Sequence, residues 1–375
     1  MKTWVSSLLA MLMVLTVFGA GEMYAGSAFA GGMSAYAESA DEEDLNTFFQ
    51  SDGMDVVFFD VGQADATLLH NDGVTMLIDA GTGAGGQMIV NYLNQAGIDT
   101  IDWLVATHAH ADHIGGMVTV MEEMEIGTVL DSGIPHTTQT YINYLEYIDD
   151  HDIPFHVPEI GEAFGFGSAD VTVVNSGLPG DSLHDGSLSL YIDYEGSTFL
   201  FTGDAETAGE QRIVDSFDFG SGVDVLQVGH HGSDTSSRPF FLDAVNPEMA
   251  VFSYGENNRY GHPHQVVVDR FLDRGTTLYS TAVSGHTEMT ASNGQVTVHT
   301  APWDGDLGDG DDGLININTA GSAELQQLEG IGPALAQNII DHRNAHGLFQ
   351  SIEQIMDVSG IGEARFAAIE NDITV

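Results

Sequence analysis

The stretch THAHADHIGG, residues 107–116, places three histidines and an aspartate directly after the apolar run WLVA. Imidazole nitrogens and carboxylate oxygens are ligands for divalent metal ions in proteins. His108 and His110 alternate along the chain, so both can face one ion, whereas Asp112 and His113 can face a second. A surface histidine cluster is the alternative, but four residues of these types after a buried strand favour a metal site.

Two later stretches end apolar runs with the same types of residue. FLFTGDAE provides Asp204 after a glycine that permits a sharp turn, and VDVLQVGHHGS provides His230 and His231. A carboxylate at such a position suits the bridging of two ions. Because ligands commonly bind beyond the strand ends of a sheet, we expect these residues to complete the site that begins at His108.

The elements that must position these residues alternate between strands and helices. Strand-like runs begin at Met54 and include the hairpin signal NDG. Helical spacing appears in residues 87–96 and 265–274, and short apolar strands such as WLVATH lie between the helical segments. This mixture predicts an α/β layered domain over residues 54–300.

The N-terminal residues predict export. Residues 1–30 run from Lys2 through an apolar stretch to AFA, which has the small-x-small form of a secretory cleavage site, so we expect a signal peptide cleaved near Ala30. A membrane anchor is the alternative, but the apolar stretch is shorter than the roughly 18 to 20 residues that span a bilayer. Residues 31–53 are acidic and polar and predict a flexible lead-in. We therefore expect a secreted or cell-surface protein with no transmembrane segment after cleavage.

The chain is strongly acidic. Its 56 Asp and Glu residues oppose 8 Lys and Arg residues, giving a formal net charge of −48, and its one lysine lies in the predicted signal peptide. Self-repulsion of this size destabilises a compact chain unless salt screens it, which indicates adaptation to high salt. Since counterion release contributes little at such salt, the acidic charge does not exclude DNA as a partner.

The chain contains no cysteine, so any metal site must use His, Asp and Glu. This ligand set favours two divalent metal ions. Zn²⁺ suits the histidines best, and Mn²⁺ is the alternative because carboxylates are present.

The C-terminal part of the chain has a different pattern. Residues 301–313, APWDGDLGDGDDG, predict a flexible acidic linker, and residues 314–375 contain two Gly-Ile-Gly sequences, each followed by an amphipathic helix. Such hairpins can hold a phosphate with main-chain N–H groups and no side-chain charge. The candidate DNA contacts are Gly330, Ile331, Gly332, Gly360, Ile361 and Gly362, with the two isoleucines anchoring the hairpins inward. A helical dimerisation module is the alternative.

Residues 54–299 resemble the metallo-β-lactamase superfamily through FFDVGQADATLL, THAHADHIGG, TGDAE, VGHHGSDTSS and ENNRYGHP, in that order. They are most similar to the extracytoplasmic hydrolase domain of ComEC-type competence proteins. The resemblance implies an αββα sandwich, and it implies that Asp60 positions the histidines. The metal ligands that it implies are His108, His110, Asp112, His113, Asp204 and His230.

One ligand position departs from the family pattern. The segment HDGSLSL offers His184 as the ligand and Asp185 as its competitor, and the choice between His230 and His231 stays open. By the same resemblance His262 faces the cleft, and either it or His231 would aid the departing oxygen; a capping role is the alternative for His262. The candidate catalytic residues are Asp112, His231 and His262.

Residues 314–375 are similar over nearly their full length to the tandem helix-hairpin-helix DNA-binding domain of ComEA-type proteins. Arg343 and Arg365 are the basic residues of this segment. The resemblance implies DNA binding, and contact with phosphates through main-chain amides reads no sequence, so the binding should be non-specific.

Together these patterns predict a secreted dinuclear-metal hydrolase that cleaves phosphodiester bonds in DNA, with the tail raising the local concentration of the substrate. It would serve DNA uptake or nutrient scavenging. One alternative is a hydrolase of another ester, such as a phosphorylcholine ester or a lactone, because the fold hosts many substrates. The other is a DNA-capture protein with weak or no catalysis.

Overall fold

The computed structural model describes residue 49, residues 53–256 and 258–307, and, in the tail, residues 315–318, 320–328, 330–346, 348–349, 351–370 and 372–374. The predicted signal peptide, nearly all of the predicted lead-in and residues 308–314 lie outside these ranges, so the interpretations of these segments stay predictions. Within the described ranges, no helix is both long enough and apolar enough to cross a bilayer.

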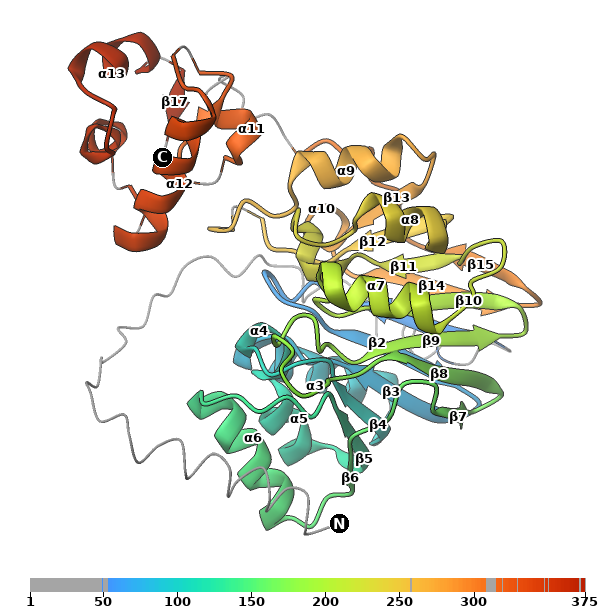
Figure 1. The fold of residues 1–375 in the computed structure, drawn as a ribbon. Coiled ribbons are helices and arrows are strands. Elements are labelled where there is room, and N and C mark those ends of the chain that lie inside the picture. The colour runs from blue at the N-terminus through green and yellow to red at the C-terminus, as the bar shows by residue number, and fades with distance from the viewer. Residues whose placement is uncertain are drawn as a thin grey trace.

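Two stacked sheets form the centre of the first domain (Figure 1). The strands of the first sheet, in spatial order, are β15 (Gln295–Val298), β14 (Thr287–Ser292), β1 (Met54–Phe58), β2 (Thr67–Asn71), β3 (Val74–Ile78), β4 (Thr100–Ala106), β5 (Glu125–Asp131) and β6 (Phe155–His156). Those of the second are β13 (Thr277–Ser280), β12 (Met249–Phe252), β11 (Val225–Gln227), β10 (Ser197–Phe201), β9 (Ser189–Tyr194), β8 (Ala169–Asn175) and β7 (Ala163–Phe166).

Helices cover the outer face of each sheet. The helices and helical turns of the first domain, in chain order, are α3 (Gly83–Ala96), α4 (Ala111–Ile114), α5 (Met117–Glu123), α6 (Gln139–Asp150), α7 (Thr207–Ser216), η1 (Gly229–Gly232), α8 (Pro239–Val245), α9 (Gln265–Leu272) and α10 (Thr281–Ser284). Helix α3 buries Ile89, Leu93 and Ala96 on one face and ends at Gly97, whose φ of 70° suits glycine.

Three apolar clusters hold these layers together. One lies between the sheets and includes Phe58 of β1 and Phe201 of β10, whose rings stack. The second packs α3, α5 and α6 against the first sheet, and the third packs α7, α8 and α9 against the second. The arrangement is helix, sheet, sheet, helix, so the predicted αββα sandwich is confirmed.

Each sheet contains a run of parallel strands. In the first sheet β3, β4, β5 and β6 pair in parallel, and in the second β10, β11, β12 and β13 do so. Parallel neighbours end at the same edge of a sheet, and for this reason residues that follow different strands meet there.

The first half of the expected linker, residues 301–313, belongs to the first domain. Trp303 is 5% exposed, its main chain bridges Leu278, and its indole N–H donates to the carbonyl of Asp306. The expectation of a flexible stretch from residue 301 was therefore wrong for this half, because one buried aromatic ring outweighs an Asp/Gly-rich composition.

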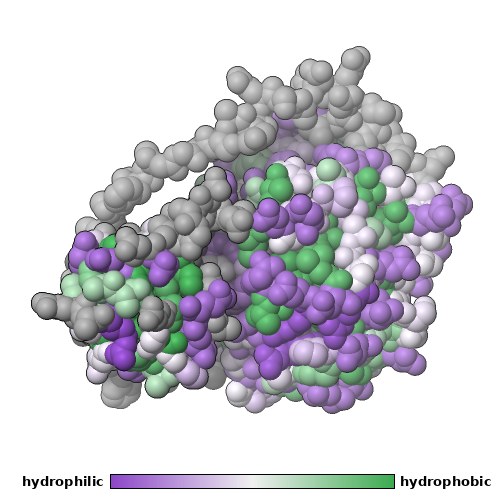
Figure 2. Space-filling view, turned by 90° about the horizontal axis from the view of Figure 1, so that it is seen from above, coloured by the Kyte–Doolittle hydropathy of each residue, from purple (hydrophilic) through white to green (hydrophobic). Residues whose placement is uncertain are grey.

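On the face in Figure 2, hydrophilic residues are interspersed with apolar patches.

The tail packs around a separate apolar cluster that includes Ile331, Ile339 and Ile361. Its elements are β16 (Ile315–Asn316), α11 (Ser322–Leu325), α12 (Pro333–His346), η2 (Ile352–Asp357), α13 (Glu363–Ile369) and β17 (Ile373–Thr374). The tail is helical as predicted, except that β16 and β17 pair in parallel and join its two ends.

Candidate metal centre

The residues singled out from the sequence meet at the edge where the parallel strands end. His108 and His110 follow β4, Asp204 follows β10, and His230 and His231 follow β11. Since β4 and β10 belong to different sheets, the centre is built from residues of both stacked sheets, which Figure 1 shows.

A first group of ligand atoms comes from His108, His110, His184 and Asp204. The distance from Nε2 of His108 to Nδ1 of His110 is 2.9 Å, and that from Nε2 of His184 to the same Nδ1 is 3.2 Å. Nε2 of His108 lies 3.6 Å from Oδ2 of Asp204. Ligand atoms bound tetrahedrally to one Zn²⁺ at about 2.0 Å are about 3.3 Å apart, so this spacing fits an ion.

A second group comes from Asp65, His113, Asp204 and His231, all of which are buried. Nε2 of His113 lies 3.3 Å from Oδ2 of Asp204, and Nε2 of His231 lies 3.9 Å from the same oxygen. Asp204 therefore belongs to both groups. This shared carboxylate is the arrangement that a bridged pair of ions requires.

Several polar atoms of the second group are buried without a hydrogen bond from any residue in the described ranges. They are Nε2 of His113, Nε2 of His231, Oδ1 of Asp65 and Oδ1 of Asp204. A buried polar atom without a partner is costly unless something else satisfies it. Imidazole nitrogens and carboxylate oxygens aimed at one another fit divalent cations, so the residues present suit the implied metal ions.

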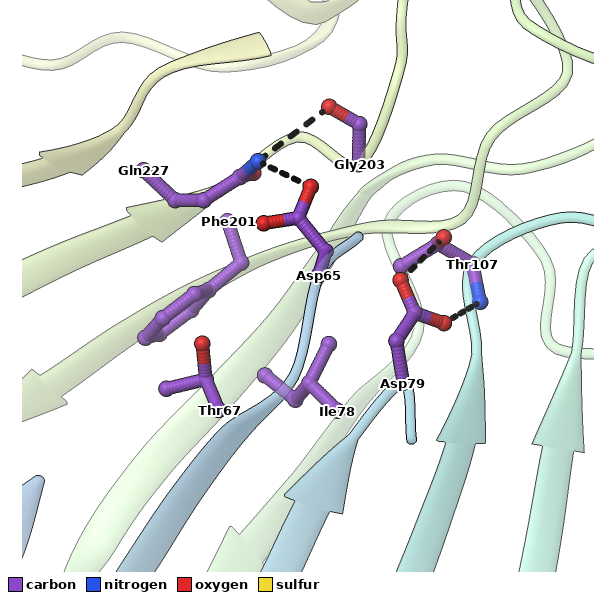
Figure 3. A pocket seen from close by; sticks show the side chains of 8 residues that line it. All are labelled: Asp65, Thr67, Ile78, Asp79, Thr107, Phe201, Gly203 and Gln227. Carbon is purple, nitrogen blue, oxygen red and sulfur yellow. Dashed lines mark hydrogen bonds between the residues drawn. The ribbon is translucent and has the colours of Figure 1, made fainter. Parts of the chain in front are cut away.

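The assignment of Asp60 as the residue that positions the histidines was wrong. Asp60 caps the turn at Gly62, and its main-chain N–H donates to His286. Asp79 takes the expected role, because its Oδ2 lies 2.7 Å from Nδ1 of His113 and both of its oxygens accept hydrogen bonds from Thr107 (Figure 3). The physical reason is strand order: β3, which Asp79 follows, is the neighbour of β4, whereas β1 is two strands further away.

Asp65 is a candidate ligand that the sequence reasoning missed. It lies just before β2, is 5% exposed, and its Oδ2 accepts a hydrogen bond of 3.1 Å from Nε2 of Gln227 (Figure 3). Asp65 and Asp79 line the same cavity between the sheets. The available signal was the acidic residue in VGQAD at the start of a buried strand, but no spacing rule connects that segment with the histidines.

The geometry places His231 and His230 in different candidate ligand groups: His231 lies with Asp65, His113 and Asp204, and His230 lies with His184 and Glu206. Nδ1 of His231 donates to the carbonyl of Ser253 at 2.9 Å, which leaves Nε2 directed at the carboxylates. His230 lies on the outer side, with Nε2 3.7 Å from Asp204 and Nδ1 3.4 Å from Glu206. Both histidines have a left-handed backbone, with φ of 52° and 55°, and this turn separates the directions of two consecutive side chains.

Asp112 lies at the margin of the second group. Its Oδ2 is 3.4 Å from Nε2 of His231, and its main-chain carbonyl accepts a hydrogen bond from the N–H of Asp65. Although burial opposes the shift, the nearby imidazole of His231, followed by the charge of His113, holds the pKa of Asp112 below its usual range. Asp112 belongs to none of these ligand groups, so its role as a metal ligand stays a prediction.

His184 and Asp185 occupy different environments. His184 belongs to the first ligand group, and its Nδ1 lies 3.1 Å from Oε1 of Glu206. Asp185 instead accepts hydrogen bonds from the main-chain N–H groups of Ala208 and Gly209 at the start of α7. The geometry therefore favours His184, since the carboxylate of Asp185 is already used at the helix end.

Burial and crowding change the acidity of the cluster. Burial, reinforced by the charge of His113, lowers the pKa of His108 well below its usual value. At His231 burial acts in the same direction, but the carboxylates of Asp204 and Asp65 outweigh it and raise the pKa to about 9. At Asp204 burial is outweighed by His113 and His231, which hold its pKa well below the usual range. The carboxylates and the imidazoles thus shift one another's pKa, at positions that metal ions can take.

His262 lies near the centre, as expected. Its ring centre is 5.5 Å from that of His230 and 6.3 Å from that of His231. Burial, reinforced by His264, lowers the pKa of His262 to about 3 in the protein without metal ions. The role of His262 in aiding the departing oxygen stays a prediction.

The two Gly-Ile-Gly sequences form hairpins ahead of α12 and α13. Ile331 and Ile361 are 4% and 3% exposed, and their N–H groups donate to carbonyls within the tail, so these two amides are not free for a ligand. Gly330 and Gly360 have φ of 75° and 97°, a backbone conformation that suits glycine. Space around Gly332 is open, as it is around Gly362, so a ligand can approach there.

Comparison with known proteins agrees with both parts of the chain. A family model described as the metallo-beta-lactamase superfamily matches residues 59–256, and one described as the helix-hairpin-helix motif matches residues 311–374. "Competence protein ComA" of Neisseria gonorrhoeae is 32% identical over 243 residues, which cover 64% of this chain and 33% of that protein.

Two proteins of Bacillus subtilis (strain 168) are also similar. "ComE operon protein 3" is 28% identical over 234 residues, covering 57% of this chain and 30% of the relative. "ComE operon protein 1" is 36% identical over 127 residues, covering 34% of this chain and 58% of the relative.

The chain spans about a third of the length of "Competence protein ComA" and of "ComE operon protein 3". The match to the first family model nevertheless covers more than half of the chain and includes the strand ends that form the candidate centre. The chain therefore belongs to the metallo-beta-lactamase superfamily and carries a C-terminal helix-hairpin-helix region.

Proposed function

We propose that this chain is an extracytoplasmic metal-dependent hydrolase that cleaves phosphodiester bonds in DNA. The observation that carries the proposal is the pair of ligand groups that share Asp204, in a chain whose tail forms two Gly-Ile-Gly hairpins. Relatives named for competence and the ComE operon support a substrate connected with DNA uptake.

When bound, two divalent ions would neutralise charge on a phosphoryl oxygen and lower the pKa of a water molecule. The chain's own residues prepare their positions. Asp79 orients His113, the carbonyl of Ser253 orients His231, and Glu206 orients His184. Fixing each imidazole through its other nitrogen selects one tautomer and keeps the ligand atom in place.

The tail would hold the DNA while the centre acts on it. Open space at Gly332 and Gly362 allows a phosphate to approach the main chain, and this mode of binding reads no sequence. A tethered binding domain raises the local concentration of a long substrate, but it contributes nothing for a small ester. The tail therefore favours a polymeric substrate over a phosphorylcholine ester or a lactone.

The test is incubation of the full chain with labelled linear and circular DNA in molar salt. The protein is first treated with a chelator, and Mn²⁺ or Zn²⁺ is then added back. We expect cleavage that depends on the added metal, and products from circular DNA would identify an endonuclease. Binding of DNA without cleavage under every condition would contradict the proposal and favour DNA capture, and turnover of other esters alone would contradict it in favour of a different hydrolase.

A further inference from the structure

Residues 258–262, in the loop between β12 and α9, are held in one shape beside the metal centre. Oδ1 of Asn258 accepts hydrogen bonds from the main-chain N–H groups of Tyr260 and His262, both at 3.1 Å. Its side-chain amide donates to the carbonyls of Gly255 and His262. One side chain therefore organises the loop, so the residues at its tip are presented in a defined position.

Tyr260 is the outer ring of a stack that leads to the candidate ligands. Its ring is nearly parallel to that of His262, with centres 5.7 Å apart and planes 25° apart. The ring of His262 is in turn nearly parallel to that of His231, at 6.3 Å and 26°. Tyr260 is itself 47% exposed and His231 is 2% exposed, so a series of aromatic rings leads from the solvent to the buried metal centre.

Arg259 covers this outer end. The central carbon of its guanidinium lies 4.8 Å from the centre of the Tyr260 ring, and its Nη2 donates to the Tyr260 hydroxyl at 2.6 Å. The pair is exposed to solvent. A planar cation on an aromatic ring offers both a stacking surface and hydrogen-bond donors.

Arg259 differs from the other arginines in the described part of the first domain. Arg212 pairs with Asp181 and Arg274 with Asp243, at 2.9 Å and 2.6 Å. Arg238 and Arg270 donate to main-chain carbonyls. Within these residues, Arg259 is the arginine whose guanidinium is held by neither a carboxylate nor a main-chain carbonyl, so its donors are available to an anionic ligand.

We propose that Arg259 and Tyr260 form a subsite for an unpaired nucleotide next to the bond that is cleaved. The base packs against the Arg259–Tyr260 pair, and the guanidinium donates to an adjacent phosphate. This subsite deepens the proposed function and rests on it, because it names the form of the DNA. Paired bases inside a duplex do not expose their faces, so the subsite favours single strands and frayed ends.

The acidity of the chain makes this contact important. A net charge of −48 opposes the approach of a phosphate backbone, and the affinity that other DNA-binding proteins obtain from many basic residues is absent here. Base stacking does not depend on net charge and tolerates every sequence. A single cation combined with an aromatic ring can therefore hold a nucleotide in an acidic chain that has few basic residues.

The test compares Tyr260→Ala, Tyr260→Phe and Arg259→Gln with the wild type in the full chain. Arg274→Gln is the control, because it removes the same charge from an arginine that pairs with Asp243 of α8. Hydrolysis of a labelled single-stranded oligothymidylate, a blunt hairpin duplex and bis(p-nitrophenyl) phosphate is measured. The quantity compared is the ratio of kcat/KM for the single strand to kcat/KM for the small diester. We expect Tyr260→Ala to lower this ratio about tenfold, whereas Tyr260→Phe should keep most of the wild-type ratio.

Arg259→Gln should lower the same ratio. It should also reduce the salt dependence of the affinity for the single strand by about one phosphate contact. Arg274→Gln should change neither quantity. Equal losses for the single strand and the small diester in Tyr260→Ala would overturn the subsite, since they would mean a disturbed metal centre. An unchanged ratio would overturn it as well.

A second measurement separates this proposal from the proposed function. Fluorescence anisotropy with the oligothymidylate is recorded on chelated protein, where no hydrolysis occurs. If the wild type hydrolyses no phosphodiester yet Tyr260→Ala weakens this binding about tenfold, the nuclease proposal fails and the nucleotide subsite stands. If the wild type cleaves DNA and Tyr260→Ala binds and cleaves equally well, the nuclease proposal stands and the subsite fails.

Discussion

The metal centre and the tail hairpins of this acidic chain are suited to ligands of opposite charge. The centre gathers buried side chains such as His108, Asp204 and His231 from separate strand ends to hold cations. In our proposal, the hairpins use a few consecutive residues, with open space at Gly332 and Gly362, to accept an anion through the main chain. An acidic composition favours the binding of cations and opposes the binding of anions. A chain with few basic residues therefore binds phosphate best through main-chain amides.

The comparison also concerns how each part depends on its surroundings. Removing one carboxylate from the centre affects two ligand groups at once, because Asp204 belongs to both. A hairpin is built locally and packs only an isoleucine into the tail core, Ile331 in one and Ile361 in the other. Mutations in the first region should therefore act on chemistry, and mutations in the second on the affinity for long DNA.

The largest effect should come from the removal of salt, which acts on both regions together. At a net charge of −48, repulsion grows as the screening length increases, so the chain should lose folded structure on dialysis from molar to millimolar salt. Circular dichroism during the dialysis measures this. A spectrum that does not change would contradict the interpretation of the charge as adaptation to high salt.

Asp204→Ala should then have the largest effect of any single substitution. It removes the carboxylate shared by both ligand groups, so we expect DNA hydrolysis to fall more than about a hundredfold, beyond the range for residues that merely orient a ligand. Metal content after gel filtration and the rate of DNA cleavage are measured together. Asp218→Asn, which changes an exposed aspartate in the turn at Gly220, is the control. Full activity in Asp204→Ala would rule out the shared-carboxylate centre.

Asp79→Asn sharpens the distinction between Asp79 and Asp60. Loss of the charge that orients His113 should weaken metal binding about 10- to 100-fold, whereas Asp60→Asn should have little effect because Asp60 contacts none of the candidate ligands in the described structure. Titration of chelated protein with Zn²⁺ measures both. Equal losses in the two variants would restore the sequence-based assignment of Asp60.

Gly332→Val combined with Gly362→Val tests the tail. The space around both glycines is open and Gly362 has an ordinary φ of −113°, so these changes should obstruct a phosphate without straining the fold. We expect affinity for long DNA to fall about tenfold, within the range for lost phosphate contacts. Hydrolysis of a small diester should fall far less than that of long DNA. Equal cleavage of long duplexes by wild type, the variant and a chain ending at residue 300 would favour a role in protein contacts.

The smallest effect on function should come from Asp131, which lies outside the centre. Burial raises the pKa of Asp131 to about 6, above its unfolded value of about 3.9, so the folded state holds the extra proton between these values. Stability should therefore fall as the pH rises through this window, by up to about 3 kcal/mol, and Asp131→Asn should abolish the fall. Urea midpoints in molar salt at several pH values measure it. A variant with an unchanged pH profile would contradict the assignment.

Much of the candidate site could be predicted because its ligands follow recognisable strands. His108, His110 and His113 lie in one short motif, and apolar runs identify the strand ends before Asp204 and His231. Asp65 and Asp79 could not be assigned in this way. Their role depends on which strands are neighbours, and neighbouring positions in a sheet are set by pairing between distant segments. Trp303 shows the same limit, because an Asp/Gly-rich sequence gives no sign that one ring inserts into a core.

The sequence by itself determined the order of strands and helices, the ligand types, the duplicated hairpins and the high negative charge, since these depend on local pattern and composition. Only the tertiary structure decided that His231 lies against Asp65 and Asp112 whereas His230 lies against Glu206, that His184 rather than Asp185 faces His110, and that Asp79 holds His113. The physical reason is that side-chain direction depends on backbone turns and packing. Two adjacent residues in a left-handed turn are chemically identical histidines in the sequence, yet the side chain of His231 is 2% exposed and that of His230 is 18% exposed.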